Sequence, residues 1–187
     1  MSTAPYEQAI VTAKKVLAGI KPEHLTAQTP CASWKVSDLI NHIVGAQHFF
    51  GTMAKGEAPS DAAAPDFSAG DFTAAFAQGA ADSVTAFKAP GMMEKTLQLP
   101  WGPMPGSAFV GLAATDTFAH AWDLARATGQ NSDLDPDLAA GLLMGARAGI
   151  SANFRGADGV APFGPEQKAP AGASKADELA AFLGRKV

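Results

Sequence analysis

"VSDLINHIVGAQHFFGTMAK", residues 36 to 55, is the stretch that decides the fold class. Written as a helix, it carries apolar side chains on two adjacent sides: Leu39, Ala46, Phe49 and Met53 on one, and Ile40, Val44 and Phe50 on the other. A helix that is apolar over so wide an arc is buried on more than one side, as in a helical bundle. The stretch therefore predicts an interior helix of an all-α domain.

The rest of the chain also favours helices, because alanine is abundant and strand-forming residues are scarce. Apolar periodicity and end signals predict further helices at about 5–20, 69–87, 107–128, 136–152 and 174–184. The alternating "TLQL" segment at 96–99, with prolines and glycines after it, predicts a short extended piece and turns. We expect one domain over residues 1–187, with its core at about 5–152 and a loop-rich tail at 153–187 that ends in an extra helix.

Composition excludes several classes of protein. Of 187 residues, 47% are hydrophobic and 17% are charged, which is typical of a globular chain with a real core. The net charge is −4 and no basic residues cluster, so we expect no nucleic-acid and no membrane partner. With Cys31 as the single cysteine, no signal-peptide pattern and no apolar run near membrane-spanning length, the sequence predicts a cytoplasmic protein.

A carboxylate and an imidazole share one face of the predicted helix "DTFAHAWDLARATG" at 116–129. Asp116 and His120 are four residues apart, so their side chains stack, in a row that otherwise holds core residues. His42 lies in a similarly apolar row of the first stretch. A buried carboxylate needs a hydrogen-bond partner, a cation or a metal, and imidazole with carboxylate suits zinc, nickel or ferrous iron.

Simpler interpretations stand beside the metal site. A single buried histidine is more often a hydrogen-bonded core residue than a ligand. Asp123 either accepts a proton from a ligating His120 ring, which would fix its tautomer, or pairs with Arg126 on the helix surface. Cys31 shows neither an adjacent base nor a cause for a lowered pKa, so we interpret it as structural. Trp34 and its counterpart Trp122 either pack the ends of the bundle or line the metal pocket.

Three motifs together resemble one known superfamily: "TPCASWKVSDLINHIVG" at 29–45, "DTFAHAWDLARATG" at 116–129 and "ASKADELAAFLGR" at 173–185. They look like the DinB-like proteins, and most like the actinobacterial branch related to the metal-binding N-terminal domain of mycothiol-dependent maleylpyruvate isomerase. The resemblance implies a four-helix bundle that holds a divalent metal near one end. It carries the ligand role onto His42, Asp116 and His120, with Asp116 standing where other members have His or Glu.

The resemblance also implies a chemistry. A divalent ion with an open position would bind a small thiol, with mycothiol as the suggested co-substrate, and direct it at a small electrophile. We therefore expect a metal-dependent thiol S-transferase or an isomerase-like enzyme. The isomerase carries a further C-terminal domain for which the tail is too short, so its own reaction is not carried over.

Two alternatives remain open at this point. One is a non-enzymatic metal-binding stress or detoxification protein, and the other is a metal-dependent hydrolase with water in the open position. The breadth of the apolar helix faces and the habit of the family also favour a homodimer.

Overall fold

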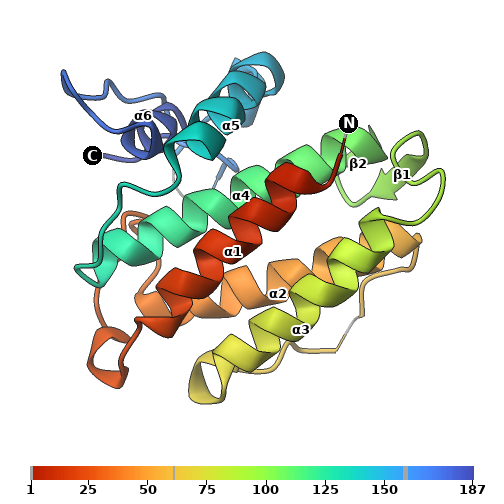
Figure 1. The fold of residues 1–187 in the computed structure, drawn as a ribbon, viewed down its shortest axis with the longest axis horizontal. Helices are drawn as coiled ribbons and strands as arrows, with labels where there is room; N and C mark the ends of the chain where they lie inside the picture. The colour runs from red at the N-terminus through yellow and green to blue at the C-terminus, as the bar shows by residue number, and fades with distance from the viewer. Residues whose placement is uncertain (1, 61, 158–159) are drawn as a thin grey trace.

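The computed structural model describes residues 2–60, 62–157 and 160–187 of the chain, and these are mostly helical (Figure 1). The helices are α1 (Ala4–Ala18), α2 (Val36–Lys55), α3 (Phe72–Phe87), α4 (Gly106–Ala127), α5 (Pro136–Gly149) and α6 (Lys175–Phe182). The strands β1 (Thr96–Leu99) and β2 (Gly102–Pro105) form an antiparallel hairpin, and short 3-10 turns lie at Pro22–His24, Phe67–Ala69 and Ala152–Phe154. The predicted helical character of the chain is confirmed.

Two helix boundaries differ from the prediction by three residues, each for a local reason, and the others agree within two residues. The helix predicted from residue 69 begins at Phe72, because Asp71 caps it by accepting the Ala74 N–H at 3.0 Å. The helix predicted to reach residue 152 ends at Gly149, because Ile150 adopts an extended backbone with φ −95° and ψ 99°. The "TLQL" segment is β1, and its pairing with β2 is the extended piece that its alternation predicts.

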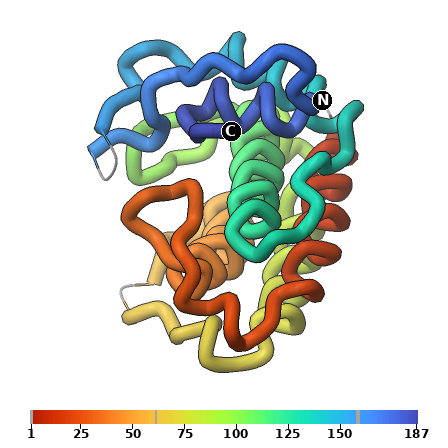
Figure 2. The backbone as a smooth tube through the Cα atoms, turned by 90° about the vertical axis from the view of Figure 1, so that its left-hand side faces the viewer, coloured from red at the N-terminus to blue at the C-terminus, as the bar shows by residue number. Residues whose placement is uncertain are grey.

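Helices α1 to α4 lie side by side and enclose the main core (Figures 1 and 2). Helix α2 packs most extensively against α3, and α4 packs most extensively against α1. Contacts of α1 with α3 and of α2 with α4 join these two pairs. The six largest fully buried side chains among the described residues are aromatic: Tyr6, Phe76, Phe87, Phe109, Phe118 and Trp122.

One group of buried polar side chains lies inside this core. The Tyr6 hydroxyl donates to Gln47 Oε1 at 2.6 Å, and its oxygen is hydrogen-bonded to Ser83 Oγ at 2.8 Å. The Gln47 amide in turn donates to Thr117 Oγ1 at 3.0 Å. We call Tyr6, Gln47, Ser83 and Thr117 the core network. Its members satisfy one another, as burial of polar groups requires.

The C-terminal segment packs on the other side of α4. Helix α6 contacts α5 and α4, and the Trp122 indole N–H of α4 donates to Asp177 at 2.9 Å. Ser174 caps α6 by accepting the Asp177 N–H, as the sequence predicts. Gly184 follows with φ +100°, and a Cβ added there would lie 2.6 Å from the Gly164 backbone. Only glycine fits this turn, which directs Arg185 back toward α4.

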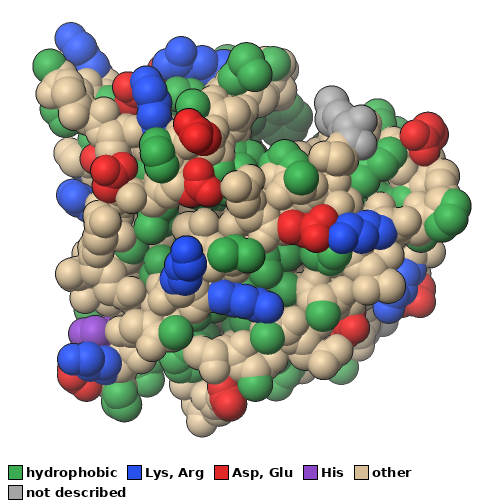
Figure 3. All heavy atoms as spheres, viewed as in Figure 1, with side chains coloured by type: hydrophobic (Ala, Val, Ile, Leu, Met, Phe, Trp, Pro, Cys, Tyr) green, Lys and Arg blue, Asp and Glu red, His purple; other side chains and the backbone are tan. Residues whose placement is uncertain are grey.

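The molecular surface has no strongly charged face in the view of Figure 3, where positive and negative side chains are interspersed. None of the helices within the described ranges is long and apolar enough to cross a membrane.

Candidate metal centre

Three side chains from two helices meet between α2 and α4. His42 Nε2 lies 3.5 Å from Asp116 Oδ1, and His120 Nε2 lies 3.5 Å from the same oxygen. The two imidazole rings are 4.6 Å apart at an angle of 75°. One ligand atom from each of the three residues lies within 4.8 Å of the other two. We call these three residues the His42 cluster.

Helical geometry explains the convergence. Asp116 and His120 are one turn apart on α4, so they project from the same face. His42 faces them from α2, where its side chain is partly exposed while its apolar neighbours Leu39 and Ile43 are buried. The sequence-predicted trio is therefore brought together in space.

Two polar atoms of the His42 cluster are buried without a hydrogen-bond partner among the described residues. His42 Nε2 and Asp116 Oδ2 are inaccessible to solvent and have no hydrogen-bond partner within residues 2–60, 62–157 and 160–187. The 3.5 Å separations from Asp116 Oδ1 are beyond the usual N–H···O range. Because an unpaired buried polar atom costs about 1–3 kcal/mol, a cluster left in this state needs a further partner. An ion bound by a ring nitrogen and a carboxylate oxygen fits that need.

In the His42 cluster, the carboxylate and the imidazoles each stabilise the charged form of the other. Burial by itself raises the pKa of Asp116, but the facing His120 and His42 rings outweigh it and hold this pKa far below its ordinary value. Burial lowers the pKa of His120, and the carboxylates of Asp116 and Asp123 outweigh it, so its pKa is raised well above the ordinary value. A proton on His120 Nε2 would therefore compete with a metal ion for the same nitrogen.

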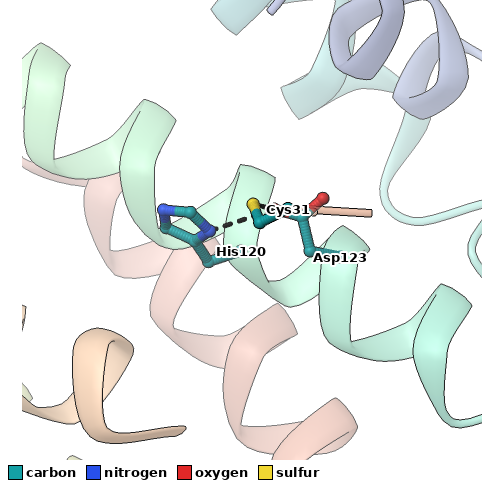
Figure 4. Close-up of side chains that lie close together, drawn as sticks. All are labelled: Cys31, His120 and Asp123. Atoms are coloured by element: carbon teal, nitrogen blue, oxygen red, sulfur yellow. Dashed lines mark hydrogen bonds and ion pairs between the residues drawn. The ribbon is translucent and has the colours of Figure 1, made fainter. Parts of the chain in front are cut away.

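A second group of side chains lies against the other nitrogen of the His120 ring (Figure 4). His120 Nδ1 is 3.0 Å from Asp123 Oδ2, and the Cys31 thiol donates to the same oxygen at 3.3 Å. The Arg185 guanidinium donates to both Asp123 oxygens, at 2.9 Å and 3.3 Å. We call Cys31, His120 and Asp123, together with Arg185, the Cys31 cluster.

Asp123 contacts His120 and does not pair with Arg126 on the surface of the helix. Its side chain has no exposed area, whereas Arg126 is exposed and lies over the Trp122 ring, 5.5 Å from the centroid. Although burial raises the pKa of Asp123, the Arg185 charge and then the His120 ring lower it far below the ordinary range. Asp123 is thus an anion that holds the His120 ring through Nδ1.

The loop between α1 and α2 covers both clusters. The Trp34 ring lies 4.7 Å from the His42 ring and 5.7 Å from the His120 ring. The loop is fixed by Thr29, whose N–H and hydroxyl both donate to the Trp34 carbonyl, at 3.1 Å and 2.8 Å. The same loop, which lies beside α4 in Figure 2, brings Cys31 to Asp123. Trp34 thus lines the site, whereas Trp122 is buried in the core.

Two sets of side chains within the described ranges have metal-ligand spacing. They differ in whether a positive charge and hydrogen-bond partners already satisfy the donor atoms. In the Cys31 cluster, the carboxylate of Asp123 is already neutralised by Arg185, and no side-chain N or O of this set is buried without a partner. In the His42 cluster, two buried atoms lack partners. The donor set and its unpaired atoms therefore fit a divalent metal better at His42, Asp116 and His120.

Sequence reasoning missed Arg185 and the position of Cys31. Both residues belong to the motifs quoted for the family resemblance, but nothing in their spacing relates them to α4. Arg185 contacts a residue 62 positions earlier, and Cys31 contacts one 92 positions later.

Comparison with known proteins identifies the class that this architecture belongs to. The family described as "Mycothiol maleylpyruvate isomerase N-terminal domain" matches residues 6–125, a range that includes α2, most of α4 and the whole His42 cluster. The chain belongs to this family, which confirms the resemblance drawn from its motifs.

The relatives share nearly the full length of the chain. Two uncharacterized proteins, from two strains of Mycobacterium tuberculosis, are each 44% identical over 174 residues, which is 92% of this chain and 91% of the relative. No solved structure matches the chain significantly.

Proposed function

We propose that the chain binds a divalent metal through His42 Nε2, Asp116 and His120 Nε2, within a DinB-like four-helix bundle formed by α1 to α4. We further propose that it is a metal-dependent thiol S-transferase or isomerase-like enzyme that uses a mycothiol-type thiol. The observation that supports the metal site most strongly is the pair of buried, unpartnered atoms, His42 Nε2 and Asp116 Oδ2. Membership of the mycothiol-related family supports the choice of thiol.

The donor set restricts the metal. Two imidazoles and one carboxylate suit zinc, nickel or ferrous iron and leave a coordination position for another molecule. Asp116 reaches less far than a glutamate at the same position would, so α2 and α4 have to approach closely at this level. The 3.5 Å separations between the imidazole nitrogens and the carboxylate are consistent with that approach.

Asp123 and Trp34 would each prepare the site. With Nδ1 of His120 donating to Asp123, the Nε2 lone pair is left free to bind a cation. The Trp34 ring lies against both histidines and shields them from water on that side. Less water raises the strength of charge interactions at the site.

A bound divalent ion would lower the pKa of a coordinated thiol from about 8.5 and hold it as the thiolate. The thiol proton would pass to solvent, and the sulfur would add to, or displace a group from, a small electrophile. The role of the residues described above is to orient that sulfur and exclude water.

Metal content tests the site. The protein is purified without a metal-affinity tag and analysed for zinc, nickel and iron, together with the variants His42→Ala and His120→Ala. His48→Ala is the matched control, because His48 lies on α2 but stacks on Phe67, with ring centroids 5.7 Å apart. We expect one metal per chain in the unaltered protein and in the control, and loss of metal in both test variants. Unchanged metal content in His42→Ala and His120→Ala would show that the ligand assignment is wrong.

Thiol consumption tests the chemistry. The metal-loaded protein is incubated with mycothiol and a small electrophile such as a maleyl compound, and adduct formation is followed against a reaction without thiol. Metal-dependent adduct formation supports the transferase. Product release without thiol would instead indicate a hydrolase, and a loaded protein inert in both reactions would indicate a metal-binding protein without this activity.

A further inference from the structure

The Cys31 cluster has the ligand atoms of a metal site but already contains a cation. A sulfur, a ring nitrogen and a carboxylate oxygen, from Cys31, His120 and Asp123, lie within 4.8 Å of one another. Thiolate together with imidazole is a preferred environment for zinc and other soft divalent metals. By donor type alone, this set would compete with the His42 cluster for the same ion, because both use His120.

The Arg185 guanidinium lies against two of the three donors. Its Nη2 is 2.9 Å from Asp123 Oδ2 and 3.6 Å from Cys31 Sγ. Its Nε completes a fork by donating to Asp123 Oδ1 at 3.3 Å. The guanidinium therefore places a permanent positive charge beside the sulfur and the carboxylate.

The chain fixes Arg185 there through its backbone. The Arg185 N–H donates to the Ala180 carbonyl at 2.9 Å, and its Nη1 donates to the Leu183 carbonyl at 3.2 Å. Gly184, with φ +100° and its backbone against Gly164, makes the turn that directs the side chain inward. Only 11% of the Arg185 side chain is exposed, so the charge is held in place and not merely nearby.

We propose that Arg185 fills the cation position of the Cys31 cluster and so confines the metal to His42, Asp116 and His120. This inference rests on the proposed metal function. The physical reason is repulsion: a divalent ion at Cys31 and Asp123 would lie next to a buried guanidinium that cannot lose its proton. Removal of the guanidinium takes away the main counter-charge of Asp123 and opens a thiol-containing position. A metal that enters it takes the Cys31 sulfur as thiolate, and the thiol proton passes to the buffer.

Cobalt(II) absorption spectroscopy tests the proposal, because thiolate ligation gives a near-ultraviolet charge-transfer band that nitrogen and oxygen ligands do not give. The metal-free unaltered protein and the variants Arg185→Ala, Arg185→Gln and Arg185→Lys are titrated with Co²⁺. We expect no thiolate band in the unaltered protein or in Arg185→Lys, which keeps the charge. We expect the band, in proportion to bound cobalt, in Arg185→Ala and Arg185→Gln, and its loss when Cys31→Ser is added to either.

A matched control separates the charge from the packing of the C-terminal segment. Arg155 anchors the same segment by donating to the Gly164 and Phe182 carbonyls, at 3.0 Å and 2.8 Å, without contacting Asp123. Arg155→Gln is therefore expected to give no thiolate band. A band in Arg155→Gln equal to that in Arg185→Gln would overturn the proposal, because any loosening of the tail would then suffice.

The remaining outcomes distinguish this inference from the proposed function. Folded Arg185→Ala or Arg185→Gln protein that shows no thiolate band overturns the role of Arg185, whether or not the unaltered protein binds cobalt at His42. A thiolate band in the unaltered protein overturns it as well. If the unaltered protein binds no cobalt but Arg185→Gln binds it with a thiolate band, the exclusion of metal from the Cys31 cluster by Arg185 stands, and the proposed metal site at His42, Asp116 and His120 fails. Circular dichroism establishes the fold, and Arg185→Gln replaces Arg185→Ala if the smaller side chain prevents folding.

Discussion

Two groups of polar side chains each include residues of α2 and α4, and they differ in how completely their hydrogen bonds are satisfied. In the core network, Gln47 joins Tyr6 to Thr117, and the hydrogen bonds among the four side chains satisfy one another. In the His42 cluster, His42 Nε2 and Asp116 Oδ2 have no hydrogen-bond partner among the described residues, and all three side chains are ionisable.

The two groups are close in sequence, which sharpens the contrast. Gln47 follows His42 by five residues on α2, and Thr117 follows Asp116 directly on α4. Since each helical residue turns the side chain by about 100°, neighbours on the same helices face different surroundings. One group closes the core, and the other retains unused bonding capacity. A completed network stabilises the fold, whereas an incomplete one marks a site for a ligand.

The largest expected effect is on metal binding by the His42 cluster. His42→Ala should weaken zinc binding by roughly 100-fold or more, since even residues that only orient a ligand cost about 10–100-fold. The free energy of unfolding without metal should change by less than about 1 kcal/mol, because the His42 side chain is one-third exposed, at 34%. Competition titration with a zinc indicator and urea unfolding in chelator measure the two quantities. A large loss of stability with intact zinc affinity would reverse the roles assigned to the two groups.

The complementary substitution acts on the core network. Gln47→Ala should lower the free energy of unfolding by about 2–4 kcal/mol, because it opens a cavity and removes the partner of Thr117. Its zinc stoichiometry should equal that of the unaltered protein. Urea unfolding and elemental analysis measure the outcome. A folded variant that has lost its metal would show that the two groups are not separable.

A smaller effect is expected at the residue that holds the His120 ring. Asp123→Asn keeps the shape but loses the charge that faces His120 Nδ1 at 3.0 Å, so zinc affinity should fall by about 10–100-fold. Asp177→Asn is the control, because Asp177 also binds an α4 side chain but contacts Trp122. Equal losses of affinity in the two variants would mean that the effect comes from the packing of α6 and not from His120.

The smallest expected effect is on the pH dependence of the metal-free protein. Because the pKa of His120 is raised above 6.5 in the folded state, its contribution to stability is complete below 6.5 and is lost as the pH rises through the folded value. The lowered pKa values of Asp116 and Asp123 contribute stability above about 4, which is lost at lower pH.

Urea unfolding in chelator between pH 5 and pH 8.5 measures this dependence. The expected loss is at most about 1.4 kcal/mol per pH unit for one proton. In His120→Gln the decline above pH 6.5 should be flatter. Stability that rises with pH in the unaltered metal-free protein would contradict the assignment of the extra proton to His120.

The sequence predicted the features of this molecule that are set within a single helix or strand. The apolar arcs of residues 36–55 gave α2 with its observed bounds, and the four-residue spacing placed Asp116 and His120 on one face. The start of α3 was missed because Asp71 caps it locally after a 3-10 turn. Periodicity says nothing of contacts between distant segments, so the return of Cys31 and Arg185 to Asp123 lay beyond it.

The packing of α1 to α4 as two helix pairs has a consequence for how the protein unfolds. His42 belongs to the α2–α3 pair, whereas Asp116 and His120 belong to the α1–α4 pair. An ion bound by all three residues would cross-link the interface between the two helix pairs, so the pairs could not separate until a coordination bond broke. The metal-bound protein should then unfold more slowly than the metal-free protein, and the amide protons of α2 and α4 at this interface should exchange with deuterium most slowly.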